Sequence, residues 1–138
     1  MNNIIQEAAT EAREYEVFWV LSADDESKPA VLTVSEAVNL SVDEFPINSI
    51  KNANTIYREL TPHLTNEELG AIWKHVSSLG RFVISRVGLR ADSIDALVRG
   101  EFHIIEINLF VPMPIHILDP DKTLMERCLL YTSDAADE

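Results

Sequence analysis

The amino-acid sequence predicts an α+β domain, in which helices pack on one face of a mainly antiparallel sheet. Three observations support this fold class. Two β-branched and aromatic runs are separated by a short polar turn, which is typical of a hairpin. An amphipathic segment then begins with a helix-capping motif. A strand, a short helix and a second strand follow it, so a single layered core is expected.

Length and charge limit the classes of function. A chain of 138 residues, 46% of them hydrophobic, is long enough for one domain and short for two. Its formal charge of −12 and its scattered basic residues argue against nucleic-acid binding. No apolar run approaches the roughly 20 residues that span a bilayer, and the single cysteine, Cys128, allows no internal disulfide. We therefore expect a cytoplasmic protein with neither membrane nor nucleic-acid partners.

The first part of the chain predicts a hairpin. Residues Asn2–Arg13 suit either a helix or a strand end that enters a loop. The run Tyr15–Ser22 predicts a strand, and a polar turn connects it to a second strand at Ala30–Val34. The pattern weakens over Ser41–Asn54, which we assign to a loop that leads to a short helix at Thr55–Leu60.

A longer helix is predicted from Thr65 onward. The Thr65 hydroxyl can cap the helix while Glu68 reaches back to the cap, as in a Thr-x-x-Glu capping box. Gly80 stands where a glycine often follows a helix. Apolar residues recur at helical spacing and predict a core face made of Leu69, Ile72, Trp73, Val76 and Leu79.

The next segment predicts a strand, a small helix and a second strand. The first strand is expected within Arg81–Arg90, and the second over Glu101–Leu109. Between them, Ser93–Arg99 carries an apolar helical face, with Asp92 placed to cap it and Gly100 placed to end it. The two strands are expected to pair in the same sheet.

The strand Phe102–Asn108 is predicted to lie in the core and to carry metal-binding side chains. Strict alternation places Phe102, Ile104, Glu106 and Asn108 on one face, and His103, Ile105 and Ile107 on the other. Neighbouring carboxylate and amide oxygens suit Mg²⁺, which takes its other ligands from phosphates and water. The proline-containing loop Val111–Pro114 then stops the strand. In the alternative interpretation, this Glu-x-Asn pair faces solvent or forms a hydrogen bond.

These residues carry a resemblance to a known family. The stretch Arg86–Asn108 reads RVGLRADSIDALVRGEFHIIEIN and resembles the last two catalytic strands of the ATP-grasp superfamily, especially its carboxylate-amine ligase-like members. Upstream, Ile4–Glu7 resembles the hinge that holds adenine, and Glu16–Phe18 resembles the strand that follows the hinge. The likeness covers about Ile4–Asp119 and implies that residues 1–127 form a partial ATP-grasp domain, its C-terminal subdomain.

The resemblance implies a role for five residues. Glu106 and Asn108 would bind Mg²⁺ that bridges the phosphates of ATP, and Arg90 would lie near the transferred phosphate. Gln6 and Glu7 would flank the adenine. The implied reaction phosphorylates a small-molecule carboxylate, and an amine or similar nucleophile then displaces the phosphate.

The chain departs from the family pattern at two points. Gly88 stands where the first strand of the family usually carries a metal-binding aspartate. The family's phosphate-binding lysines and glycine-rich loop precede the hinge, and no such loop occurs among the four glycines of this chain. We therefore do not expect this chain to turn over ATP by itself. A homologue that has lost catalysis, or an acidic α+β interaction module, would be the alternative.

The last eleven residues resemble something other than protein. Residues 128–138 read CLLYTSDAADE and are similar to the translation of an adapter used in DNA sequencing. We expect this tail to be artefactual, and we expect the natural chain to continue beyond about Arg127.

Overall fold

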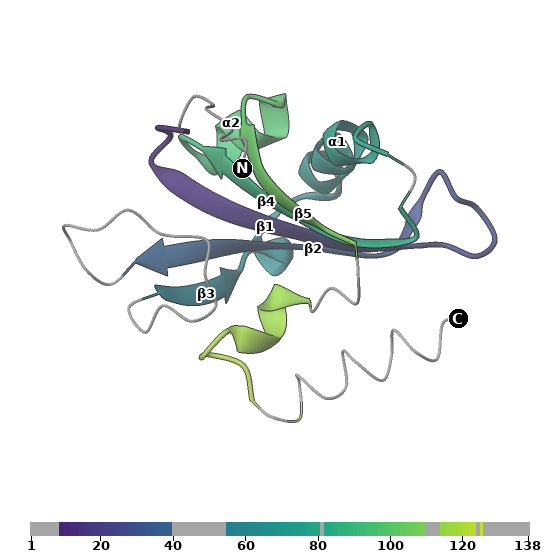
Figure 1. The fold of residues 1–138 in the computed structure, drawn as a ribbon. Coiled ribbons are helices and arrows are strands. Elements are labelled where there is room, and N and C mark those ends of the chain that lie inside the picture. The colour runs from purple at the N-terminus through teal and green to yellow at the C-terminus, as the bar shows by residue number, and fades with distance from the viewer. Residues whose placement is uncertain (1–8, 40–54, 81, 110–113, 124, 126–138) are drawn as a thin grey trace, which may run out of the picture.

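The computed structural model describes residues 9–39, 55–80, 82–109, 114–123 and 125, which form a five-stranded antiparallel sheet (Figure 1). Every neighbouring pair of strands is antiparallel, which confirms the predicted character of the sheet. The strands follow the order β3-β2-β1-β4-β5 across the sheet. Their bounds are β1 Arg13–Leu21, β2 Pro29–Asn39, β3 Thr55–Glu59, β4 Ile84–Ala91 and β5 His103–Asn108.

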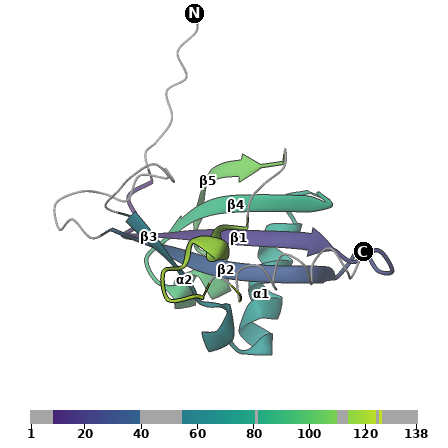
Figure 2. The same ribbon diagram turned by 90° about the horizontal axis from the view of Figure 1, so that it is seen from below.

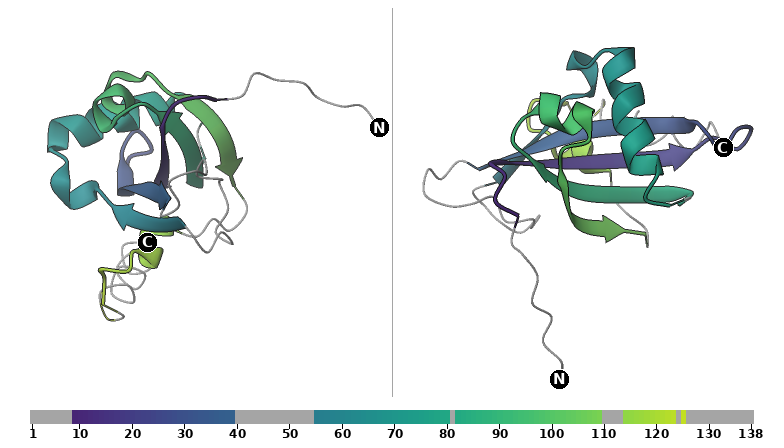
Figure 3. Two further views of the ribbon diagram at one scale, coloured as in Figure 1. Left: turned by 90° about the vertical axis from the view of Figure 1, so that its left-hand side faces the viewer. Right: turned by 90° about the horizontal axis from the view of Figure 1, so that it is seen from above.

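Both α-helices cover the same face of the sheet. Helix α1 spans Asn66–Ser77 and helix α2 spans Ile94–Arg99, and they lie side by side over the sheet in two views (Figures 1 and 3). The 3₁₀ helix η1, Thr61–His63, precedes α1. A second 3₁₀ helix, η2, spans Ile115–Leu118 and lies against the opposite face, where Figure 2 shows it in front of the sheet.

The main hydrophobic core lies between the sheet and the two α-helices. Alternate residues along a strand point to opposite faces, and the apolar set of each central strand points toward the helices. Trp19 is fully buried there and donates a hydrogen bond of 2.9 Å from Nε1 to the carbonyl oxygen of Phe82. The strands contribute Tyr15, Val17, Trp19, Val34, Val87, Leu89 and Ala91, and the helices contribute Ile72, Val76, Ala96 and Leu97.

The structure confirms the predicted start of α1. The Thr65 side chain accepts a hydrogen bond of 3.1 Å from the backbone N–H of Glu68, and the Thr65 backbone N–H donates one of 3.0 Å to the Glu68 carboxylate. These reciprocal bonds satisfy two N–H groups that the first turn of a helix leaves without partners. Ile72 and Val76 are buried, and the other predicted core residues of the helix pack around them.

Replacing Thr65 with alanine is expected to lower the free energy of unfolding by about 1 kcal/mol, because the cap of α1 is lost. Chemical denaturation followed by circular dichroism would measure this change. Ser77→Ala, at the last residue of α1, is the matched control and should change stability by less than about 0.5 kcal/mol. Equal stability of the Thr65→Ala variant and the unchanged chain would contradict the prediction.

Helix α2 begins one residue later than predicted. Ser93, rather than Asp92, is the N-cap, and its Oγ accepts a hydrogen bond of 3.1 Å from the backbone N–H of Ala96. Ser93 has the extended backbone that a cap needs, whereas Asp92 lies one residue too far from the first turn. Gly100 ends the helix as predicted, with a φ of 82° in the left-handed region that glycine adopts without strain.

The predicted helix at Thr55–Leu60 is wrong, because this segment is strand β3. Its β-branched and aromatic residues suit a strand, and it pairs with β2 so that Tyr57 lies opposite Ala37. Tyr57 and Ala37 are buried beside Ile115 of η2 in a second, smaller apolar cluster. Tertiary pairing therefore decides the conformation of a segment that is too short for a helical period to show.

Most of the segment Asn2–Arg13, which suits either a helix or a strand end, lies outside the described residues. Its described residues 9–12 form no helix, and β1 begins at Arg13. Strand β2 is longer than the predicted Ala30–Val34 and reaches Asn39. No helix in the described part of the chain has the length and apolar character needed to cross a lipid bilayer.

Strand β5 lies at one of the two edges of the described sheet, so the expectation that it lies in the core is wrong. Ile104, Ile105 and Ile107 are 43%, 37% and 40% exposed. The pairing with β4 also shifts register between Gly88 and Leu89, where Ile105 has no Cα partner. Such a bulge interrupts strict alternation, which a sequence pattern alone does not show.

Candidate functional site

The face of the sheet turned away from the α-helices carries most of its polar side chains. Residues paired across neighbouring strands project to the same face, so the register identifies the residues of this face. We call the part of it that is aligned with Glu14, Glu16 and Phe18 of β1 the polar face. It consists of Glu14, Glu16, Phe18, Thr33, Ser35, Ala37, Tyr57, Glu59, Arg86, Gly88, Arg90, His103, Glu106 and Asn108.

One row of the polar face crosses all five strands. It runs from Glu59 through Ser35, Glu16 and Gly88 to Glu106, each paired with the next. Gly88 has no side chain, and the side chain of Arg86, two residues earlier on β4, reaches between the carboxylates of Glu16 and Glu106. The position where the family pattern expects an aspartate is therefore flanked on both sides by glutamates.

The structure brings Glu106 and Asn108 together, as their spacing predicts. Asn108 donates a hydrogen bond of 3.0 Å from Nδ2 to Oε1 of Glu106. The Glu106 side chain is 36% exposed and therefore accessible from solvent. Two oxygen-bearing side chains thus lie side by side at the accessible end of the polar face.

The guanidinium of Arg86 lies between two carboxylates. Its Nε is 3.6 Å from Oε2 of Glu16, and its terminal nitrogen is 3.9 Å from Oε1 of Glu106. The side chains of Arg86 and Glu16 are only 9% and 2% exposed. Little water screens these charges, so the interactions among the three groups are stronger than at a surface.

Arg90 lies on the same face as Glu106, nearer to the start of β1. Its Nε and a terminal nitrogen both donate to the backbone carbonyl of Glu11, at 3.0 and 2.7 Å. Its direct strand partners are Glu14 on β1 and His103 on β5. Arg90 therefore fixes the chain entering β1 and brings positive charge next to a buried carboxylate.

His103 also belongs to the polar face, which corrects the predicted alternation. Strict alternation puts His103 and Glu106 on opposite faces, but the bulge at Ile105 brings both to the same one. His103 forms an ion pair with Glu11, from the segment just before β1. The N-terminal end of the polar face is thus bordered by the same segment that Arg90 holds.

Burial strongly disfavours the charged forms of two glutamates on β1. Glu14 is fully buried, and neither of its carboxylate oxygens has a hydrogen-bond partner among the described residues. Desolvation raises its pKa to about 7, although Arg90 opposes the shift. Desolvation raises the pKa of Glu16 to about 8 against the attraction of Arg86, and the charges of Glu14 and Glu106 add to the rise. Near neutral pH, these raised pKa values therefore keep a large part of both groups in the neutral, protonated form.

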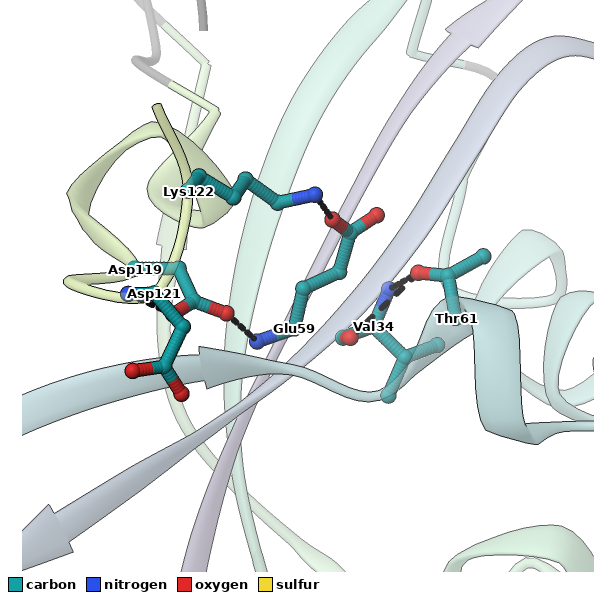
Figure 4. A network of polar contacts seen from close by, with 6 residues as sticks. All are labelled: Val34, Glu59, Thr61, Asp119, Asp121 and Lys122. Atoms are coloured by element: carbon teal, nitrogen blue, oxygen red, sulfur yellow. Dashed lines mark hydrogen bonds and ion pairs between the residues drawn. The ribbon is translucent and has the colours of Figure 1, made fainter. Parts of the chain in front are cut away.

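The opposite end of the polar face is closed by η2 and the turn after it (Figure 4). Asp119 accepts a hydrogen bond of 2.8 Å from the backbone N–H of Glu59, and the Glu59 carboxylate forms an ion pair with Lys122. Beside them, Thr61 Oγ1 accepts a bond of 2.9 Å from the backbone N–H of Val34. The contacts of Asp119 and Lys122 with Glu59 hold the segment after β5 against the β3 side of the sheet.

Two of the sequence-based assignments lie outside the described residues. Gln6 and Glu7, expected to flank adenine, fall in the segment 1–8. The sequence pattern does not single out Glu14 as a site residue, and Glu16 appears only within the segment Glu16–Phe18 that resembles a strand of the family. The sequence does contain a pattern that could identify them, because Glu14 and Glu16 alternate with Tyr15 and Val17. In a strand that is buried on both faces, such carboxylates are shielded from solvent.

The donor set fits Mg²⁺ that also binds phosphate. No group of three or more His, Cys, Asp or Glu side chains in the described residues is arranged to hold a metal ion. Mg²⁺ does not require such a cage, since it is commonly bound by one or two carboxylates, with water and phosphate completing its six ligands. The carboxylate of Glu106 and the amide of Asn108 are ligands of the right kind, whereas the carboxylate of Glu16 is buried against Arg86.

Comparisons with protein-family models, with curated proteins and with solved structures found no match for this chain.

Proposed function

We propose that this chain forms the C-terminal part of an ATP-grasp ligase, in which the polar face binds Mg-ATP. The main observation in favour of this proposal is that one face of the antiparallel sheet, opposite the helices, carries Glu106, Asn108, Arg86 and Arg90. Glu106, Asn108 and Arg90, which the family resemblance associates with metal and phosphate, thus share one face, although they come from two strands. The proposed reaction activates a small-molecule carboxylate as an acyl phosphate, which an amine or similar nucleophile then attacks.

Each group on the polar face has a definable part in that proposal. Glu106 and Asn108 supply neighbouring oxygen ligands from one strand, so their separation is set by the backbone. Bound Mg²⁺ would neutralise phosphate oxygens and hold them in position. Arg86 and Arg90 keep positive charge on the same face, where phosphate groups carry negative charge. Helices on the far side exclude water from the back of the sheet and keep it rigid.

A nucleotide-binding homologue without ligase activity is the second candidate. The observation that favours it is Gly88, which removes one carboxylate from the row that contains Glu106. Arg86 also lies within 4 Å of Glu106, so a guanidinium already provides part of the cationic charge. Such a protein would bind nucleotide on the same face without transferring phosphate.

Calorimetric titration of the chain with Mg-ATP tests the binding that both candidates share. We expect the unchanged chain to bind and Glu106→Ala to bind at least tenfold more weakly, because a negatively charged ligand of the metal is removed. Glu101→Ala is the matched control, since Glu101 is an exposed carboxylate that pairs with Arg99 before β5 begins. The control should bind like the unchanged chain.

The outcomes separate the interpretations clearly. Equal affinity of Glu106→Ala and the unchanged chain would remove Glu106 from the site. Absence of binding by the unchanged chain would contradict the proposed function and favour an interaction module. Binding that requires Glu106, without phosphate release when candidate carboxylates are added to the natural full-length protein, would select the non-catalytic homologue.

A further inference from the structure

We propose that β5 is a self-association surface, through which two copies of this chain pair antiparallel and join their sheets. Strand β5 lies at one border of the described sheet and pairs with β4 alone among the described strands (Figure 2). Half of the backbone N–H and C=O groups of such a strand point away from its sheet and are open to another strand. The inference goes beyond the proposed function and does not depend on nucleotide binding.

Exposed apolar side chains gather at this edge of the sheet. Seven large apolar residues in the described part of the chain are exposed, and all of them except Met125 belong to β5, follow it directly or lie at the start of β4. These six residues are Val83, Ile84, Ile104, Ile105, Ile107 and Leu109. Apolar surface that is gathered in one place is uncommon on a monomeric protein and typical of an interaction site.

Two isoleucines of β5 extend the main core beyond the area that the helices cover. Ile107 pairs with Val87 and Ile104 pairs with Leu89, and both partners are fully buried in the main core. Ile104 and Ile107 therefore project to the helix-covered face, although a large part of each remains exposed. A second strand alongside β5 would place apolar side chains next to them and remove this surface from water.

The residues from Ile105 to Leu109 are self-complementary in one register. A two-fold axis perpendicular to a sheet keeps each residue on its own face, so the axis of an antiparallel pair passes through one residue that meets its own copy. With the axis at Ile107, each Ile107 faces the other, Glu106 faces Asn108 of the second copy, and Ile105 faces Leu109. Apolar side chains then meet apolar ones, and each carboxylate meets an amide.

Two other registers are unfavourable. An axis at Glu106 would set two carboxylates directly opposite each other, and like charges in that position destabilise a pair of strands. An axis at Ile105 would place the Glu106 carboxylate opposite the apolar side chain of Ile104. The match of charge and polarity around Ile107 therefore favours a second copy of this chain as the occupant of the edge.

Sedimentation equilibrium of the unchanged chain tests the association itself. Contact through one short strand is at the small end of specific interfaces, so we expect a dimer with a dissociation constant on the order of micromolar. Each chain carries a formal charge of −12, and repulsion between the copies opposes the pairing. Salt screens this repulsion, so the dimer should become tighter as sodium chloride is raised from about 0.05 to about 0.5 M.

A lysine at the centre of the pair tests the surface. Ile107→Lys would set two ammonium groups opposite each other at the axis, and it should weaken dimerisation by at least about tenfold. Met125→Lys is the matched control, because Met125 is an exposed apolar residue outside the edge. The control should associate within about threefold of the unchanged chain. A thermal melt of each variant confirms that it is folded.

Cysteine cross-linking tests the register. In a Cys128→Ser background, Ile107→Cys should form an intermolecular disulfide on oxidation, because Cα atoms directly opposite in an antiparallel pair lie about 4.5–5.5 Å apart. Leu109→Cys is the control in the same background. The two copies of residue 109 would lie roughly 14 Å apart in this register, which is too far for a disulfide.

The outcomes separate the possible occupants of the edge. A chain that stays monomeric up to about 200 μM would overturn the inference and leave the edge to another segment of the natural protein or to a different partner. A dimer that Ile107→Lys leaves unchanged, or one that forms no disulfide through Ile107→Cys, would overturn it as well. A dimer that is weakened by Ile107→Lys, kept by Met125→Lys and cross-linked at residue 107 but not at 109 supports it.

Discussion

Glu16→Gln is expected to stabilise the fold at alkaline pH. Burial raises the pKa of Glu16 to about 8, from its ordinary value of 4.5. Between these values the folded state binds more protons than the unfolded state, so stability is greatest below about pH 4.5 and falls as pH rises through 8. The fall is at most about 1.4 kcal/mol per pH unit for one group. Glutamine stays neutral, so the variant avoids this loss.

Urea unfolding of the two proteins across the pH range measures the effect. The difference in unfolding free energy should be near zero at about pH 4 and reach on the order of 5 kcal/mol in favour of the variant at about pH 9. Glu101→Gln is the control and should show no such gain with rising pH, because the hydrogen bond from Arg99 lowers the pKa of this exposed carboxyl. A constant difference between Glu16→Gln and the unchanged chain at every pH would refute the prediction.

Trp19→Ala is expected to lower the free energy of unfolding by about 3–5 kcal/mol, because it removes the largest fully buried side chain of the core. Trp19 also packs edge-on against Trp73, with ring centroids 5.6 Å apart. Its loss would leave the Phe82 carbonyl without the hydrogen bond that Trp19 donates. A domain of this size has a total stability of about 5–15 kcal/mol, so the variant would lose a large part of it.

Two variants make the measurement interpretable even if Trp19→Ala fails to fold. Trp19→Phe keeps an aromatic ring in the core and should lose about 1–3 kcal/mol in chemical denaturation. Trp73→Ala is the comparison on α1, where the ring is partly exposed and its Nε1 bonds to Ser27, and it should cost less than Trp19→Ala. A cost below about 1 kcal/mol for Trp19→Ala would show that the ring does not hold the core together.

The parts of the fold that repeat a pattern several times were predictable. Five apolar residues at helical spacing and a capping box identified α1, and the β-branched and aromatic run after Arg13 identified β1. Shorter signals failed. Strand β3 has five residues, too few to distinguish a strand from a helix, and its pairing with β2 depends on contacts remote in sequence. Asp92 and Ser93 both suit a cap, and backbone geometry rather than composition chose Ser93.

The candidate site was predictable along one strand and not across strands. The spacing of Glu106 and Asn108 predicted that both project to the same face of the sheet, because the alternation of side chains depends only on neighbouring residues of one strand. That Glu16 lies opposite Gly88 follows from the register between β1 and β4, which a single sequence does not specify. The place of His103 depends on a bulge, a one-residue irregularity that leaves no compositional trace.

The position of β5 at the border of the described sheet affects how firmly its side chains are held. An outer strand is bonded to the sheet along one side, so it opens locally with a smaller free energy than the strands in the middle. Glu106 and Asn108 belong to this outer strand, whereas Glu16 belongs to the central strand β1. Arg86 lies near both Glu16 and Glu106, so it links this outer strand to the centre of the sheet. Amide hydrogens along β5 should exchange with solvent faster than those along β1, and Mg-ATP bound as proposed at Glu106 and Asn108 should slow the exchange along β5.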